Sequence, residues 1–198
     1  MGKFLKPGSP LLRDLAEEIS PDQINSPEVK KITKLMFKII TGEQKKNGKG
    51  VGLAAPQIGI LKRIILVDVA ADGKGKVGDL KIFINPEIIW VSKRKKEWYE
   101  GCYSTGMVCG IVSRPILIKV KAFTENGSPW EDKVRGYVAR IFQHEIDHLN
   151  GQVFISHIKD PSKLHKVSKK EFPLYRKSWR RWPNKYPLPL AYGKLKKV

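Results

Sequence analysis

Residues 143–151 read Gln143-His144-Glu145-Ile146-Asp147-His148-Leu149-Asn150-Gly151, and this stretch decides the fold. Two of its histidines, His144 and His148, are four residues apart, so on a helix they share one face with Cβ atoms about 5–6 Å apart. Two imidazoles so placed can bind one metal ion, and Glu145 between them can move protons for a metal-bound water. The stretch therefore predicts a metal-binding helix, with two ordinary helical histidines as the alternative.

The flanking residues support a helix over 136–149. This range contains no proline, and its apolar residues recur at helical spacing. Gly151 follows and suits the left-handed conformation in which many helices end.

The third ligand separates two kinds of metal site. Cys102 would add a thiolate to the two imidazoles and leave a fourth position for water, as catalytic zinc sites do. Glu171, the one glutamate that follows His148, would instead complete a zinc endopeptidase site. Phe154 stands where the long metalloprotease pattern has its last histidine, which excludes that pattern. Spacing alone leaves both Cys102 and Glu171 open.

The composition indicates a soluble globular protein. The 198 residues suit one domain with a sizeable core, and 41% of them are hydrophobic and 29% charged. No apolar run approaches the roughly 20 residues that a membrane span needs. The start of the chain carries no signal core or transit segment, so we expect a cytoplasmic location, or a mitochondrial or plastid matrix if a transit peptide was removed. Two cysteines, Cys102 and Cys109, are too few for a disulfide scaffold.

Charge is concentrated toward the end of the chain. The net charge is +19, from 38 basic and 19 acidic residues, and such an excess favours contact with polyanions, above all nucleic acid. After Gln152 only Asp160 and Glu171 oppose a run of Lys and Arg, and residues 179–183 interleave Trp with Arg. We therefore expect a catalytic domain over 1–158 and a basic C-terminal extension over 159–198; a merely solvated surface is the alternative.

Strands are expected in the middle of the chain, with helices around them. Ser26-Pro27 predicts the start of a helix that ends at Gly42. Strands are predicted over 64–69, 82–84, 88–91 and 116–123, and Asn126-Gly127 predicts a hairpin after the last of these. This order favours an α+β fold with antiparallel sheets packed around a central metal-binding helix, followed by an extended basic tail.

Small residues dominate the stretch 50–59. Their density allows close approach of the backbone to another surface, but the Gly-Lys-Ser/Thr ending of a phosphate loop is missing. We interpret this stretch as a tight loop that presents main-chain groups and the Gln57 amide to a ligand.

Three motifs now stand in order along the chain: Gly50-x-Gly52-Leu53-Ala54-Ala55-x-Gln57, Glu100-Gly101-Cys102-x-Ser104 and Gln143-His144-Glu145-x-Asp147-His148-Leu149. The set and its spacing resemble peptide deformylase over about residues 1–160, with the organelle-type branch and its bacterial relatives most similar.

The resemblance implies removal of the formyl group from the N-terminal formyl-methionine of nascent polypeptides. Cys102, His144 and His148 would hold one divalent metal ion, Fe(II) in the cell, with Zn, Ni or Co in preparations. A metal-bound water would attack the formyl carbon, and Glu145 would act as general base and then general acid. The Gln57 amide and the backbone N–H of Tyr103 would stabilise the oxyanion.

Further roles follow from the same resemblance. Gly52, Val51 and Gly101 would bind the substrate, Glu100 and Arg114 would brace the cysteine loop, and Asp147 would support the metal site. The chain departs from the family pattern at Tyr103, where most active members have Leu, and at Cys109, where many carry Arg. Both departures point to altered handling of the peptide rather than to loss of the metal site.

The expected partners are formyl-Met nascent peptides and the ribosome near its exit site, reached through the basic surface, with no membrane. Two rival hypotheses remain: a zinc endopeptidase that uses Glu171, and a non-catalytic basic protein that binds ribosomes or RNA.

Overall fold

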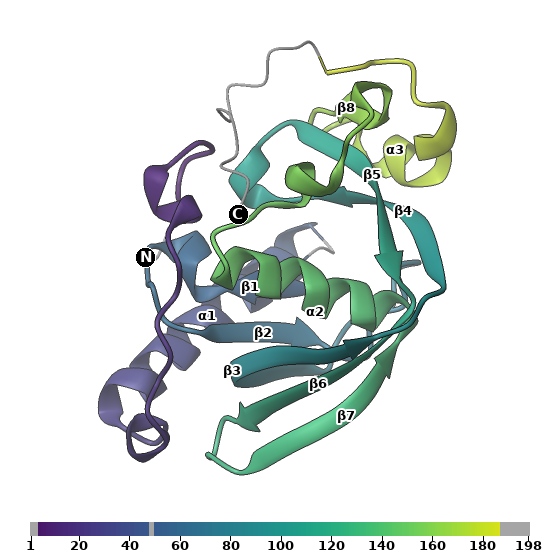
Figure 1. Ribbon diagram of the computed structural model, residues 1–198. Coiled ribbons are helices and arrows are strands. Elements are labelled where there is room, and N and C mark those ends of the chain that lie inside the picture. The colour runs from purple at the N-terminus through teal and green to yellow at the C-terminus, as the bar shows by residue number, and fades with distance from the viewer. Residues whose placement is uncertain (1–3, 48–49, 187–198) are drawn as a thin grey trace.

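Two antiparallel sheets enclose one helix in the computed structural model, which describes residues 4–47 and 50–186 (Figure 1). The larger sheet has the order β1-β2-β3-β6-β7. Its strands are β1 (Gly52–Ala54), β2 (Ile64–Asp68), β3 (Leu80–Val91), β6 (Leu117–Thr124) and β7 (Pro129–Arg135). The smaller sheet consists of β4 (Lys95–Gly101), β5 (Val108–Pro115) and β8 (Leu164–Lys166), in that order.

Helices α1 (Pro27–Asn47) and α2 (Gly136–Leu149) lie on opposite faces of the larger sheet. The third helix, α3 (Phe172–Ser178), packs on the smaller sheet. Short 3-10 turns complete the described elements: η1 (Pro10–Arg13), η2 (Pro21–Gln23), η3 (Ala55–Ile58), η4 (Tyr103–Thr105), η5 (Phe154–His157), η6 (Pro161–Lys163) and η7 (Trp179–Arg181). The α+β class with antiparallel sheets around a central helix is confirmed.

Strand β2 explains how the layers are joined. All five of its residues are buried, because alternate side chains enter two different cores. Ile65 and Val67 pack with α2, whereas Ile64 and Leu66 pack with the apolar face of α1. The predicted strand over 64–69 is thus doubly covered, which accounts for its continuous apolar sequence.

Helix α2 has the bounds that its sequence predicts. Gly136 opens it at φ 65°, and Gly151 beyond its end has φ 66°, the left-handed conformation expected there. A Cβ at Gly151 would overlap the backbone of Arg13, so this glycine also lets the N-terminal segment pass close by. The helix is therefore fixed at both ends between the two sheets.

Two other local predictions are confirmed in part. The hairpin at Asn126-Gly127 joins β6 to β7, with Gly127 at φ 83°. The two short strands predicted around Asn85-Pro86 are one strand, β3, whose register with β6 shifts there. Asn85 has φ 50° and its side chain bonds both backbone groups of Ile19, so the irregularity anchors the N-terminal segment rather than ending the strand.

The predicted end of α1 is wrong, since the helix continues past Gly42 to Asn47. The described part of the basic tail is also not extended: it forms β8, α3 and η7. Tyr175, Trp179 and Trp182 are buried there against Trp98 and Tyr99 of β4. Burial of these aromatic side chains therefore holds residues 164–182 on the smaller sheet. The division of the chain into a catalytic domain over 1–158 and an extension over 159–198 stays a prediction.

Within residues 4–47 and 50–186, no helix combines the length and the apolar character needed to cross a membrane.

Candidate active site

Cys102, His144 and His148 meet between the two sheets. One ligand atom from each lies within 4.8 Å of the other two, and Cys102 Sγ is 3.3 Å from His148 Nε2. The histidines come from the C-terminal half of α2, and the cysteine follows β4 directly, at the start of η4. The structure therefore brings together the three residues for which the motifs predicted metal binding.

Glu100 orients one of these histidines. Its Oε2 lies 2.9 Å from His144 Nδ1, which leaves His144 Nε2 to face the centre. Arg114 donates to both oxygens of Glu100, at 2.6 and 2.9 Å, and Arg140 donates to Oε1 at 2.6 Å. Burial opposes the ionisation of Glu100, but Arg114 and His144 outweigh it and hold the pKa of this carboxyl well below its usual range.

The donor set suits a divalent metal ion. Burial opposes ionisation of the Cys102 thiol, yet His148 and His144 hold its pKa well below its usual range, so a thiolate is favoured. A thiolate and two imidazoles with room for a fourth ligand are the usual set of a catalytic rather than a structural site. The carboxylate behind His144 adds the outer support that metal-binding histidines commonly have. The residues present therefore fit the metal.

Glu145 lies beside this centre and is almost completely buried. Its Oε2 has no hydrogen-bond partner among the described residues, and burial raises the pKa of this carboxyl to about 7. A Cβ on Gly52 of β1 would overlap Glu145 Oε1 and lie 2.8 Å from Ile141 Cγ2. The absence of a side chain at Gly52 thus leaves room for Glu145, whose carboxyl has the proton affinity of a base near neutral pH.

Gln57 reaches the centre from η3. The backbone N–H of Ala54 donates to Gln57 Oε1 at 2.8 Å, which fixes the orientation of the amide. Its Nε2 then donates toward Cys102 Sγ at 3.1 Å and Ser104 Oγ at 3.3 Å. The amide donor therefore points at the centre, and its presentation to a ligand stays a prediction.

Tyr103 follows Cys102 and begins η4. Its ring stacks on Phe4 with 4.2 Å between centroids, and its hydroxyl donates to Glu43 Oε2 at 2.9 Å. Burial, and then Glu43, raise the pKa of this phenol. The side chain of Tyr103 is thus held by both the N-terminal segment and α1.

The remaining candidate residues surround the centre. Val51 lies half-buried before β1, and its carbonyl accepts from Asp68 N at 2.8 Å. Gly101 ends β4 opposite Cys109, whose Sγ would lie 2.9 Å from a Cβ at position 101. Asp147 contacts Arg114 at 2.9 Å and His157 at 2.8 Å. Asp147 therefore braces Arg114, and through it Glu100.

Glu171 does not belong to the centre, so the endopeptidase alternative is wrong. Its Oε2 accepts from Ser168 N at 2.9 Å, which places it in the turn before α3. Among described residues, the group that can hold a metal consists of Cys102 and the two histidines. The downstream glutamate serves the turn and not the metal.

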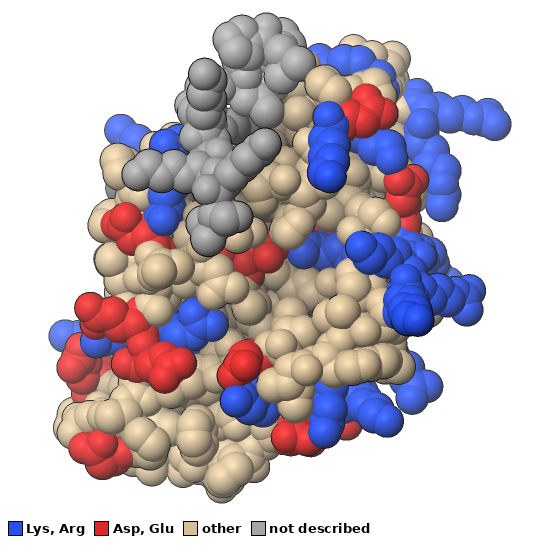
Figure 2. Space-filling view, in the orientation of Figure 1, with Lys and Arg blue, Asp and Glu red and all other residues tan. Residues whose placement is uncertain are grey.

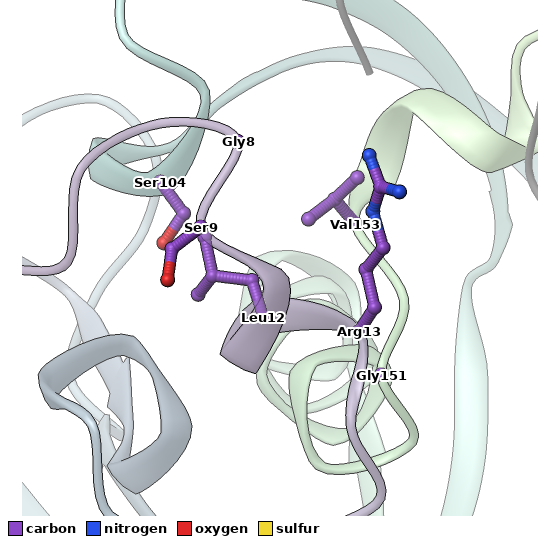
Figure 3. Close-up of a pocket in the computed structure, with 7 residues that line it drawn as sticks. All are labelled: Gly8, Ser9, Leu12, Arg13, Ser104, Gly151 and Val153. Atoms are coloured by element: carbon purple, nitrogen blue, oxygen red, sulfur yellow. The ribbon is translucent and has the colours of Figure 1, made fainter. Parts of the chain in front are cut away.

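A small cavity of about 20 Å³ lies behind Ser104, between the N-terminal segment and the residues after α2 (Figure 3). Ser9 and Ser104 lie on one side of it and Arg13 with Val153 on the other. Its volume suits about one water molecule, so it is not a peptide-binding cleft.

Arg140 is the site residue whose role the sequence did not reveal. It lies one turn before His144 on α2, is largely buried, and donates to Glu100, to Val112 O at 3.1 Å and to Lys96 O at 2.6 Å. A charged residue on the apolar face of a buried helix was the available signal, because such a charge needs a partner.

Comparison with known sequences gives a family. The sequence profile of the family described as polypeptide deformylase matches residues 1–164. A peptide deformylase of Leptospira biflexa is 37% identical over 161 residues, which cover 79% of this chain and 87% of that protein. One of Pelotomaculum thermopropionicum is 43% identical over 139 residues, covering 69% and 84% respectively.

Solved structures agree in fold and sequence. A class I type b peptide deformylase from Acinetobacter baumannii has a TM-score of 0.71 and 34% identity, covering 78% of this chain and 97% of that one. A probable peptide deformylase from Synechococcus phage S-SSM7 has a TM-score of 0.67 and 34% identity, covering 80% and 100%. The chain therefore belongs to the polypeptide deformylase family and is a metal-dependent hydrolase of that kind.

Proposed function

We propose that this protein removes the formyl group from formyl-Met nascent peptides with Glu145 as the proton carrier and Gln57 and Tyr103 as oxyanion donors. The observation that carries the proposal is the meeting of Cys102, His144 and His148 beside a buried Glu145 with an unpaired oxygen. Cys102, His144 and His148 would hold a divalent ion, which would supply Lewis acidity to a water in the site.

Each further step belongs to a residue of the chain. Glu145 accepts the proton of the attacking water at its unpaired Oε2 and later donates it to the leaving amine. Gln57 Nε2 and the N–H of Tyr103 donate to the formyl oxygen as negative charge develops on it. Gly52, Val51 and Gly101 offer main-chain groups to the peptide.

Gln57→Ala tests the oxyanion assignment. Loss of one preorganised donor lowers kcat by about 10²–10³. We expect that loss in formate release from formyl-Met-Ala-Ser, with metal content unchanged. A kcat within threefold of the unmodified enzyme would contradict the assignment of Gln57.

We propose Fe(II) as the native metal, because the family resemblance implies it and the imidazoles of His144 and His148 suit iron among other transition metals. Both ferrous iron and a thiolate oxidise in air. Formate release by apoprotein reconstituted with Fe(II) should therefore decay within hours in air, and more slowly with Zn, Ni or Co. Full retention in air by the iron form would contradict this choice.

Ribosome contact is a second proposal, and a basic surface supports it. Lys and Arg gather on the side of the molecule where β4 and α3 lie (Figure 2). Trp98 of β4 contacts Trp179 of η7 with 5.8 Å between centroids, which joins two basic segments. Lys96 lies over the Trp98 ring and Arg180 over the Trp179 ring, at 5.1 and 4.2 Å. This basic face suits phosphate groups of ribosomal RNA.

Charge-matched variants test that contact. K93Q/R94Q/K95Q removes three charges from the basic face, and K30Q/K34Q/K38Q removes three exposed charges from α1. We expect the first set to weaken co-sedimentation with ribosomes about tenfold at moderate salt, and the second to weaken it far less. Equal effects would mean that net charge alone governs binding.

A cytoplasmic location stays a prediction.

A further inference from the structure

We infer that the end of α1, through Glu43 and Gln44, is a positioning device for the substrate site. It fixes the backbone on two sides of that site, at Tyr103 and where the chain enters β1. Glu43 holds Tyr103, next to the metal ligand Cys102, and Gln44 holds Gly50, which leads into β1. This inference rests on the proposed roles of the Tyr103 N–H and of Gly52. It assigns a role to a helix turn that contributes no group to the chemistry.

The Glu43 contact acts on the oxyanion side. The Tyr103 hydroxyl donates to Glu43 Oε2 at 2.9 Å while Phe4 stacks on the other part of the ring. The side chain of Tyr103 is thus held at its tip and along its face. Because η4 spans only Tyr103–Thr105, fixing this side chain also restricts the backbone N–H of the same residue.

The Gln44 contact acts on the peptide side. Gln44 Nε2 donates to Gly50 O at 3.0 Å and to Asp68 Oδ2 at 2.9 Å. Asp68 is fully buried at the end of β2 and also accepts from Gly78 N at 2.7 Å. The Gln44 amide therefore links the carbonyl oxygen of Gly50 to the fixed carboxylate of Asp68. Gly50 has φ 101°, and the chain enters β1 with a defined direction.

The two contacts come from consecutive residues, so they are coupled by the helix itself. Gly42 lowers helix propensity just before them, yet the helix continues. Glu43 Cβ would lie 3.4 Å from a Cβ at Gly50, which shows how closely this turn packs on the substrate loop. A misplacement of about 1 Å can cost about 10² in rate, so a device that fixes both sides of the site has a measurable effect on turnover.

The Glu43 contact and the Gln44 contact predict different effects on kcat and KM. Glu43→Ala frees Tyr103 and should lower kcat about tenfold with KM within twofold, because the oxyanion donor acts in the transition state. Glu43→Gln keeps an acceptor oxygen for the hydroxyl and should stay within threefold of the unmodified enzyme. Gln44→Met should raise KM about fivefold with kcat within twofold, because the β1 side of the site binds the peptide in both states.

A double-mutant cycle tests whether Glu43 acts through Tyr103. Tyr103→Phe keeps the ring and its stacking but removes the hydroxyl, so Glu43→Ala should have no further effect in that background. Lys45→Ala, on the exposed side of the same turn, is the matched control and should leave both constants unchanged. Metal content and the unfolding midpoint are measured for every variant.

Two results would overturn the inference: a kcat for Glu43→Ala within twofold of the unmodified enzyme, or an undiminished loss in the Tyr103→Phe background. Failure of the proposed function is a separate result, because the unmodified enzyme would then release no formate from formyl-Met-Ala-Ser. If the unmodified enzyme releases formate and Glu43→Ala leaves kcat unchanged, the positioning role is refuted and the proposed function is not.

Discussion

Glu100 Oε2 lies 2.9 Å from His144 Nδ1, and this contact joins the three proposed metal ligands to a buried network of charge. Glu100 itself is held by Arg114 and Arg140, and Arg114 reaches on to Asp147. One carboxylate thus links β4, β5 and α2 at the point where the metal ligands meet. The metal site and the joint between the sheets depend on the same residue.

Replacing Glu100 should therefore affect stability and metal affinity together. Glu100→Gln leaves Arg140 without its anion and Arg114 with Asp147 alone, which costs about 3–5 kcal/mol of unfolding free energy. Loss of the support behind His144 should also weaken metal binding about 10–100-fold. Urea unfolding and metal competition measure the two effects. Glu97→Gln, half-exposed on the same strand, is the control and should change stability by less than about 0.5 kcal/mol.

Glu145→Gln should separate metal binding from turnover. The amide has nearly the same shape, so the three ligands keep their positions, but it cannot carry a proton. We expect a full complement of metal and a kcat lower by about 10³ or more. Elemental analysis and formate release measure these quantities. A variant that turned over at a tenth of the original rate would remove Glu145 from its proposed role.

Gly52→Ala should lose most of its activity although the change is a single methyl group. The new Cβ would overlap Glu145 Oε1 and lie 2.8 Å from Ile141, so β1 or the carboxylate must shift. We expect kcat/KM to fall by about 10². Gly42→Ala is the matched control, because nothing lies within 4 Å of a Cβ there, and it should stabilise the protein by about 0.5–1 kcal/mol. Equal activities of the two variants would contradict the packing described for Gly52.

His165 makes stability depend on pH. Burial, with Lys185 at 3.2 Å, lowers the pKa of this imidazole to about 4, and the Tyr175 hydroxyl lies 3.0 Å from its other nitrogen. Between pH 6.5 and 4 the unfolded chain binds this proton and the folded chain does not. The associated stability is complete above pH 6.5 and is lost as the pH falls toward 4. Urea unfolding at pH 7 and pH 5 should show a larger loss, by about 1–2 kcal/mol, for the unmodified protein than for His165→Gln. Parallel curves would contradict a neutral buried His165.

The aromatic residues of α3 test whether residues after 158 fold with the rest. Tyr175 is fully buried and contacts Tyr99 and Trp182, whereas its neighbour Leu174 is 60% exposed. Tyr175→Ala should cost about 3–5 kcal/mol within a single unfolding transition, and Leu174→Ala less than about 0.5 kcal/mol. Two separate transitions would instead support an independent extension beginning at 159.

Much of the fold and the metal centre could be predicted from the sequence because the signals were local. The spacing of His144 and His148 places them on one helix face, and Asn126-Gly127 specifies its hairpin. The motif around Cys102 identified the third ligand only through the family resemblance. In each case a few neighbouring residues determine the conformation.

The parts that were missed depend on distant contacts. Five of the eight residues of strand β5 are buried and one is exposed, so it lacks the alternation by which strands are recognised. Helix α1 continues past Gly42, where Glu43 bonds to Tyr103 and Gln44 to Asp68, both distant in the sequence. The tail folds back because Tyr175 and two tryptophans find Trp98 and Tyr99 on β4. Contacts between residues so distant in the sequence cannot be predicted from a local sequence pattern.

Formate release by the purified metal-loaded enzyme, compared with that of Cys102→Ala, tests the central claim most directly. The account predicts steady formate release from formyl-Met-Ala-Ser by the unmodified enzyme and none above background from the variant, whose thiolate ligand is gone. Release that survives loss of Cys102, or an unmodified enzyme that retains its metal and releases no formate, would contradict it.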